Sequence, residues 1–119
     1  MSISEGGSCG YVKWNNTKFW AGGHCYTLLN VDENKILNKF LYQILKNDEK
    51  KLMRLGVGSG LKNIQKLDVE NFKIKLPSIK EQNKISKFLN FLDLKINKCF
   101  NEIILLKRFK KGLLQKMFC

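Results

Sequence analysis

Residues 76–97 read LPSIKEQNKISKFLNFLDLKIN, and the character of the chain changes within this stretch. The only proline, Pro77, closes the part before it. Ser78, followed by Glu81 three residues later, has the pattern of a capping box, in which each residue bonds the backbone N–H of the other. We therefore predict that a helix begins here and continues to the end of the chain.

Beyond Ser78 the apolar residues keep a heptad repeat, with steps of four and three residues in alternation. A helix of roughly 40 residues extends about 60 Å, which is more than the domain before Pro77 can cover. Its apolar stripe needs a partner helix, so we predict an assembly helix of the coiled-coil type. Its contact positions are expected to be Ile85, Leu89, Leu92, Ile96, Cys99, Ile103, Leu106, Leu113 and Met117.

The part before Pro77 is predicted to be a small mixed α/β domain. Glycines among aromatic and β-branched residues indicate short strands and tight turns over residues 1–30. An amphipathic pattern predicts a helix over 34–47 with a shorter piece through Leu52, and a glycine-rich loop follows at 56–63. The fold class is α+β, with a domain at 1–76 and a long helix at 77–119. Extended stretches are expected at 10–14, 18–21, 24–29 and 72–76.

The charge balance indicates a polyanionic partner. The chain has 22 Lys and Arg against 10 Asp and Glu, a formal net charge of +12, and 44% hydrophobic residues, so a folded basic protein is expected. Cations placed on phosphates release counterions, which makes nucleic acid the first candidate and an anionic membrane surface the second. The alternative is that the lysines only keep the protein soluble.

Several function classes are disfavoured. The amino terminus has no secretory pattern and no apolar run approaches the roughly 20 residues of a membrane helix, so a cytoplasmic location without membrane contact is expected. The spacing of His24 and the cysteines matches no structural zinc module, and no catalytic set is recognised, so we expect neither a metal site nor catalytic residues. The thiols are expected to be free: Cys9, Cys25, Cys99 and Cys119.

Two regions carry the candidate nucleic-acid contacts. Cations and amides near the aromatic residues of 11–20 can reach phosphates and base edges, whereas Phe19 and Trp20 are expected in the core. The loop at 56–63 fails both the dinucleotide and the Walker pattern, but its polar side chains can approach a phosphate backbone. The candidate DNA-binding residues are Lys13, Asn15, Asn16, Lys18, His24, Ser59, Lys62 and Asn63.

Five segments together resemble the specificity subunits of type I restriction-modification systems. The elements LPSIKEQ at 76–82 and KKGLLQKMF at 110–118 are the most specific of these, in this order and at this separation. The glycine motifs are each weak alone. The segments are EGGSCGYVKW at 5–14, KFWAGGHCY at 18–26, GSGLKNI at 58–64, FKIKLPSIKEQNKI at 72–85 and LKRFKKGLLQKMF at 106–118.

The resemblance implies a target-recognition domain followed by a conserved spacer helix that pairs with its counterpart. It implies a non-catalytic subunit that selects a split sequence in double-stranded DNA and docks methyltransferase and restriction subunits. Those partners would use S-adenosylmethionine, and ATP with magnesium. It also implies that the chain holds only part of one recognition domain, so a second specificity chain or a homodimer is a further expected partner.

Two alternatives to DNA recognition stay open. The chain could be a helix-mediated interaction protein that captures a methyltransferase or another specificity subunit without reading DNA. It could also be an inactive truncated remnant. Substitution of the loop lysines distinguishes DNA reading from pure interaction, because only DNA reading depends on them.

Overall fold

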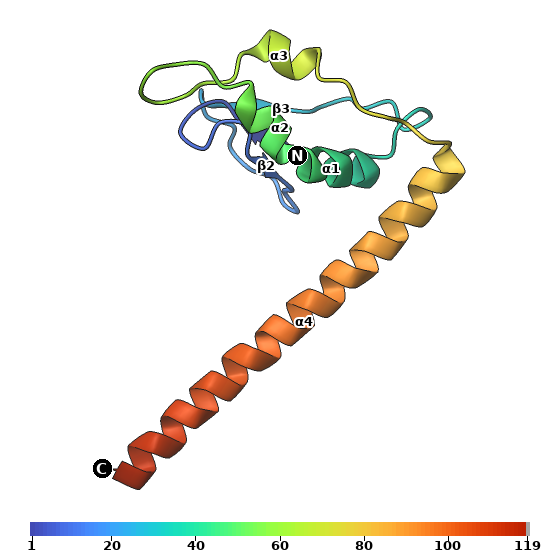
Figure 1. Cartoon of the computed structure of the whole chain (residues 1–119). Helices are drawn as coiled ribbons and strands as arrows, with labels where there is room; N and C mark the ends of the chain where they lie inside the picture. The colour runs from blue at the N-terminus through green and yellow to red at the C-terminus, as the bar shows by residue number, and fades with distance from the viewer. Residues whose placement is uncertain (119) are drawn as a thin grey trace. The chain divides into compact units, whose positions relative to one another are not determined.

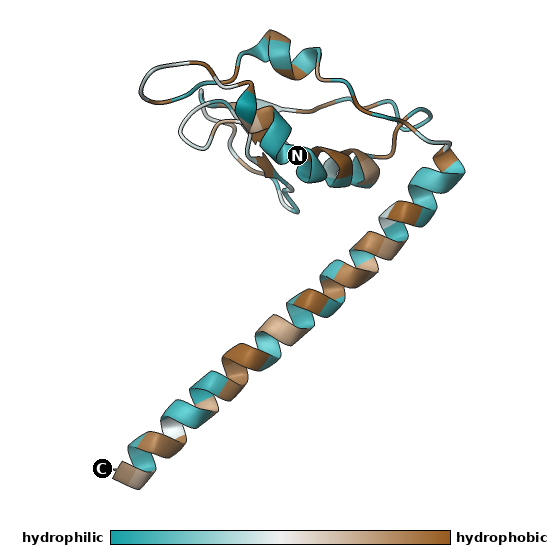
Figure 2. Cartoon of the chain, viewed as in Figure 1, coloured by the Kyte–Doolittle hydropathy of each residue, from teal (hydrophilic) through white to brown (hydrophobic). Residues whose placement is uncertain are grey.

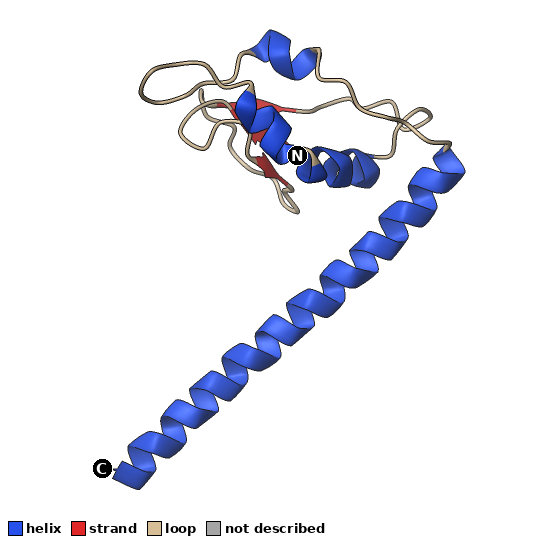
Figure 3. Cartoon of the chain, viewed as in Figure 1, coloured by secondary structure: helices blue, strands red, loops and turns tan. Residues whose placement is uncertain are grey.

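The computed structural model describes residues 1–118 and has the predicted α+β composition (Figures 1 and 3). The chain forms two compact units, Met1–Ser86 and Lys87–Cys119. No helix among the described residues has the length and apolarity to cross a membrane. The elements are β1 (Ser2–Ser4), β2 (Val12–Lys13), β3 (Cys25–Thr27), α1 (Asn38–Asn47), α2 (Glu49–Arg54), α3 (Lys66–Glu70) and α4 (Ile79–Phe118).

A three-stranded antiparallel sheet in the order β2-β1-β3 forms the centre of the first unit. Ile3 of β1 lies opposite Val12 of β2 and Tyr26 of β3. Among the expected extended stretches, 10–14 and 24–29 contain β2 and β3, whereas β1 was not singled out by any pattern. No strand forms at 18–21 or 72–76, because no neighbouring strand of the described chain offers these segments a ladder of hydrogen bonds.

The core lies between one face of this sheet and the first two helices. Ile3 and Val12 of the sheet pack with residues of α1 and α2, and Ile64 closes the cluster from the loop before α3. Leu52 and Ile64 are completely buried, as is Ile3. The predicted helix at 34–47 begins later than expected, at Asn38, because the residues before it form a turn instead. In that turn the N–H groups of Lys35 and Ile36 donate to the carbonyl oxygen of Asp32.

The start of α4 is fixed by two sets of contacts within the first unit. The capping box is confirmed: Glu81 Oε2 accepts from the N–H of Ser78 at 3.1 Å, and Ser78 Oγ accepts from the N–H of Glu81 at 3.4 Å. The next residue, Gln82, is completely buried. Its Oε1 accepts from the N–H of Leu37 at 2.9 Å, and its Nε2 donates at 3.0 Å to the carbonyl oxygens of Lys35 and Pro77.

Replacement of Gln82 is expected to destabilise the first unit strongly. Gln82→Ala removes three hydrogen bonds and leaves backbone groups without partners, at about 1–3 kcal/mol for each group that stays buried. The free energy of unfolding, measured by urea titration, should fall by about 2–4 kcal/mol. The matched control is Asn83→Ala on the exposed side of the same turn, which should change stability by less than about 0.5 kcal/mol. Equal losses for the two variants would contradict this role of Gln82.

Candidate nucleic-acid interface

Glu5 joins three segments that are far apart in the sequence. Its N–H donates to the carbonyl oxygen of His24 at 2.9 Å, and its carbonyl oxygen accepts from the N–H of Ile64, also at 2.9 Å. The hydroxyl of Tyr26 lies 3.2 Å from Glu5 Oε1 and 3.0 Å from the carbonyl oxygen of Ile64. We call this set of contacts the Glu5 junction. It brings the turn after β1, the start of β3 and the end of the glycine-rich loop together.

The Glu5 junction perturbs one ionisable group. Burial is the main cause that raises the pKa of the Tyr26 hydroxyl above its ordinary value of 10.0. The charge of the Glu5 carboxylate and the hydrogen bond to it raise this pKa further. The hydroxyl therefore stays protonated at neutral pH and can donate within the junction. The Glu5 carboxylate also lies 3.8 Å from Nδ1 of His24, whose side chain is 91% exposed.

The turn after β1, at residues 6–10, meets the glycine-rich loop beside the Glu5 junction. Val57 and Asn63 exchange backbone hydrogen bonds of 2.9 and 3.0 Å, so the loop at 56–63 is closed on itself. The side chain of Asn63 lies over Gly6, where an added Cβ would come within 2.3 Å of Asn63 Oδ1. At Gly10 the backbone has φ +78° and an added Cβ would lie 2.7 Å from the backbone nitrogen of Met53. A side chain at Gly6 would therefore push the glycine-rich loop away, and one at Gly10 would collide with the backbone of α2.

The eight candidate DNA contacts fall into two groups. The first group consists of four exposed residues, His24, Ser59, Lys62 and Asn63. The Glu5 junction holds this group near Ser4, the last residue of β1. In the antiparallel register Lys13 pairs with Ser2, so its group begins at the opposite end of β1. This second group is Lys13, Asn15, Asn16 and Lys18.

The second group is partly held by other side chains. Asn15 Nδ2 donates to Ser2 Oγ at 3.1 Å, and Asn16 Oδ1 accepts from the indole N–H of Trp14 at 2.6 Å. The amide oxygen of Asn16 is therefore occupied. Sequence reasoning missed Lys39 of α1, whose Nζ lies 3.7 Å from the centre of the Trp14 ring. The sequence gives no sign of this contact, because the two lysines of α1, Lys39 and Lys46, are seven residues apart and form no pattern with Trp14.

The expectation that Phe19 and Trp20 belong to the core is wrong. Trp20 is 92% exposed and Phe19 is 43% exposed. Both lie in the irregular connection between β2 and β3, where the described chain provides no layer to cover them.

Among residues 1–118 no three His, Cys, Asp or Glu side chains gather to hold a metal ion. Cys9, Cys25 and Cys99 are free thiols, and Cys119 lies outside the described residues.

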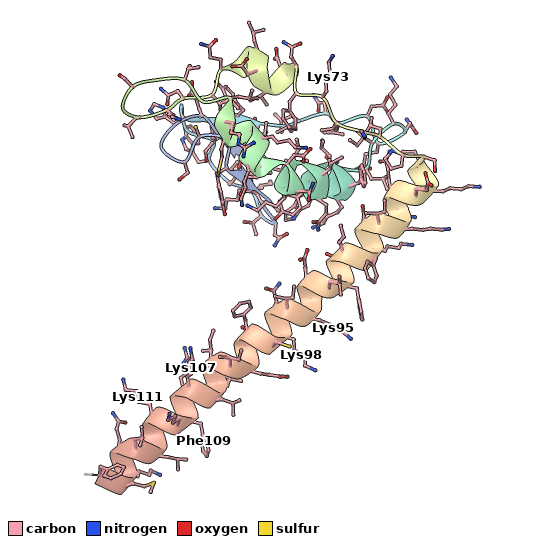
Figure 4. The ribbon with its side chains drawn as sticks, viewed as in Figure 1. Lys73, Lys95, Lys98, Lys107, Phe109 and Lys111 are labelled. Atoms are coloured by element: carbon pink, nitrogen blue, oxygen red, sulfur yellow. The ribbon has the colours of Figure 1, made fainter. Side chains whose placement is uncertain are left out.

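The apolar positions of α4 beyond Lys87 form a broad stripe, visible as brown bands along the helix in Figure 2. Leu106 and Met117 are 67% and 72% exposed. A shallow hollow of about 240 Å³ is lined by Ile96, Cys99 and Ile103, which are consecutive predicted contact positions, with Lys95 and Phe100. Lysines are interspersed along the same helix, and Figure 4 shows four of them projecting from it: Lys95, Lys98, Lys107 and Lys111.

Comparison with known proteins identifies the family. Residues 1–107 match the model of the type I restriction modification DNA specificity domain. A putative type I specificity subunit of Mycoplasma pneumoniae is 38% identical over 109 residues, which is 91% of this chain and 29% of the relative. The chain therefore belongs to the type I restriction modification DNA specificity domain family.

Further relatives agree with this assignment. A putative type I specificity subunit of Mycoplasma genitalium is 29% identical over 119 residues, covering 99% of this chain and 31% of the relative. The crystal structure of a type I restriction-modification S subunit from M. genitalium matches 98% of this chain and 32% of that chain, with a TM-score of 0.86 and 27% identity. The present chain thus spans about a third of the length of these relatives.

Removal of the Tyr26 hydroxyl is expected to loosen the Glu5 junction. Tyr26→Phe leaves the carbonyl oxygen of Ile64 without this donor, so the free energy of unfolding should fall by about 1–2 kcal/mol. Amide exchange at Ile64 should accelerate in parallel. Tyr42→Phe, a half-buried tyrosine on α1, is the matched control and should have a smaller effect. Unchanged exchange at Ile64 in Tyr26→Phe would argue against the junction.

The raised pKa of Tyr26 also predicts a pH dependence. A group whose pKa is higher in the folded state stabilises the fold fully below its unfolded value of 10.0. That contribution is lost as the pH rises through the folded-state value. The stability difference between the unmodified chain and Tyr26→Phe should therefore be constant from pH 7 to 9 and shrink above pH 10, as measured by urea titration. A difference that grows above pH 10 would contradict the direction of the shift.

Proposed function

We propose that this chain is a DNA-recognition module of a type I restriction-modification complex. The observation that carries the proposal is the Glu5 junction, which holds the exposed His24 beside the polar glycine-rich loop within a domain that matches the specificity family. The net charge of +12 favours a polyanionic partner for such a surface.

The candidate residues suit two kinds of DNA contact. Lys13, Lys18 and Lys62 are exposed cations of the type that bind phosphates and fix the position of a protein on the duplex. The amide of Asn63 and the ring of His24 offer donors and acceptors that match base edges in the major groove. The loop containing Asn63 is closed by backbone bonds, which reduces the entropy lost when it binds.

The stripe on α4 supports a second part of the proposal, in which the helix assembles the complex. Exposed Leu, Ile and Phe along a helix of 40 residues are typical of a coiled-coil or bundle contact. We propose that the partner helix belongs to a second specificity chain, in the simplest case a second copy. Methyltransferase and restriction subunits would dock on this assembly in the cytoplasm and hold S-adenosylmethionine, ATP and magnesium.

Neutralising the three exposed lysines is expected to weaken the salt dependence of DNA binding. Each phosphate contact contributes about 0.9 to the slope of log K against log salt concentration. Replacement of Lys13, Lys18 and Lys62 by Gln should therefore lower the slope by up to about 2.7, as measured by fluorescence anisotropy with a duplex between about 50 and 200 mM salt.

The matched control replaces three other exposed lysines of the same unit, Lys50, Lys73 and Lys75, by Gln; Lys73 is labelled in Figure 4. This control changes the net charge equally and should leave most of the slope in place. An unchanged slope in the first variant, or equal reductions in both, would argue against these contact residues.

Acidic side chains in the α4 stripe are expected to abolish self-association. Leu92→Asp combined with Leu106→Asp places charges in the proposed contact, where they would be buried without a partner. The unmodified chain should sediment as a dimer and the double variant as a monomer at the same micromolar concentration. The control, Asn90→Asp with Asn101→Asp, alters positions of the heptad outside the stripe and should stay dimeric. A monomeric unmodified chain would refute pairing of two copies.

A second candidate function is capture of a partner by α4 without DNA reading. The broad exposed stripe is the observation that favours it, since the stripe does not depend on the Glu5 junction. Loss of partner binding in the Leu92 and Leu106 variant is expected for both functions. The lysine variants distinguish them, because pure capture predicts no change in any activity of the assembled complex.

A further inference from the structure

The side chain of Trp14 is docked on the first helix. Its ring centre lies 5.6 Å from that of Tyr42, with an interplanar angle of 55°. The ammonium of Lys39 lies 3.7 Å from the centre of the same indole ring. Lys39 and Tyr42 are one turn apart on α1, and Leu41 and Leu45 anchor that helix in the core. Aromatic and cation–π contacts both favour a defined ring position, so Trp14 has a fixed place on α1.

The indole N–H of Trp14 sets the orientation of the Asn16 amide. It donates to Asn16 Oδ1 at 2.6 Å. Because an indole nitrogen is only a donor, the amide turns its oxygen toward the indole and its nitrogen away from it. The side chain of Asn16 is exposed. The two N–H donors of its Nδ2 are therefore the groups that this amide presents to a partner.

Cations surround this amide. Lys13 precedes Trp14 and Lys18 follows Asn16 in the sequence, and both lysines are exposed. Lys39 adds a further cation where α1 contacts Trp14. Such cations are suited to phosphates, to which a neutral amide adds no charge. Oriented N–H donors instead distinguish one base edge from another, so the Asn16 amide is better suited to a base than to the phosphate backbone.

We propose that Asn16 is a specificity-determining residue that donates a hydrogen bond to a purine N7 in the major groove, with Trp14 as its positioning residue. An N7 acceptor occurs in every base pair, because adenine and guanine both carry it on their major-groove edge. The indole bond orients the amide before DNA binds, which reduces the entropy lost on binding. The inference rests on the proposed function, because it requires this chain to read DNA.

The first measurement tests the positioning bond without DNA. The chain has two tryptophans, so its indole N–H groups give two signals in a proton–nitrogen NMR spectrum. Hydrogen exchange of the Trp14 signal should be about fivefold slower than that of Trp20, whose side chain is 92% exposed. Asn16→Ala should remove this difference. Equal exchange rates in the parent chain would overturn the positioning role of Trp14.

The second measurement tests the base contact. The parent chain selects its preferred duplex from a random library, and each purine of that duplex is then replaced in turn by its 7-deaza analogue. This analogue carries C–H in place of N7 and keeps its base pairing. One replacement should weaken binding to the parent chain about tenfold, as measured by fluorescence anisotropy. The same replacement should cost nothing further in Asn16→Ala, and this non-additivity identifies the contact.

Trp14→Phe separates orientation of the amide from packing on α1. Phenylalanine keeps an aromatic ring beside Lys39 and Tyr42 but has no N–H to hold Asn16. The penalty for the 7-deaza purine should therefore fall from about tenfold to less than about threefold. The salt slope should stay unchanged, because no cation is removed. Trp20→Phe is the matched control and should keep the full penalty, whereas a merely structural role of Trp14 would weaken binding to all duplexes alike.

Two results would overturn the inference and leave the proposed function standing. One is a selected duplex with no 7-deaza penalty, or with every penalty retained in Asn16→Ala, which would assign the amide to another acceptor such as a phosphate oxygen. The other is a full penalty in folded Trp14→Phe. Slow amide exchange at Ile3 verifies the fold of each variant, and Asn16→Ala decides the base contact if Trp14→Phe fails to fold.

Failure of the proposed function has a different signature. If the parent chain selects no duplex although its Trp14 indole is protected, DNA recognition itself is contradicted, and the base contact of Asn16 with it.

Discussion

The Glu5 junction is the contact on which the candidate DNA surface depends. Three groups of this one residue hold two other segments: the backbone N–H binds His24 and the carboxylate binds Tyr26 at β3, and the carbonyl oxygen binds Ile64 after the glycine-rich loop. Without these bonds the end of the glycine-rich loop would be held beside the sheet only by the burial of Ile64 in the core. Holding the loop in one position costs conformational entropy. The hydrogen bonds of the Glu5 junction, which are partly shielded from water, offset this cost.

The helix depends on a different constraint, which is the exposure of its apolar residues. Folding of the first unit buries only the first turns of α4, where Gln82 and Ser86 are buried. The residues that follow have side chains suited to a core and none is buried within the described chain. A helix of this length is stabilised mainly by packing of its apolar face rather than by intrinsic propensity. Its stability and its assembly are therefore expected to be linked.

Sequence reasoning succeeded where the determining interactions are local. The capping box at Ser78 and Glu81 and the heptad of α4 are patterns of near neighbours, so the long helix was predicted correctly. The family resemblance was likewise confirmed by the match over residues 1–107. The eight DNA-binding positions stay a prediction, since no comparison tests them.

The parts that were missed depend on contacts between distant residues. β1 is three residues long and is defined by partners 9 to 25 positions away, which no short pattern shows. The burial of Gln82 depends on Leu37 and Lys35, so the sequence offered no sign that this amide joins α4 to the domain. The apolar character of Trp20 alone predicts a place in the core. Its exposure depends on which segments lie next to β3, and periodicity carries no information about that.

The most direct measurement of the central claim is a methylation assay in cells. The chain would be co-expressed with the methyltransferase subunit of its own system, and modified adenines in the host DNA would be mapped by sequencing. Two copies that pair through α4 and each read one half-site should generate a new methylated motif that is split and palindromic. No new modification, with both proteins present and folded, would contradict DNA recognition by this chain.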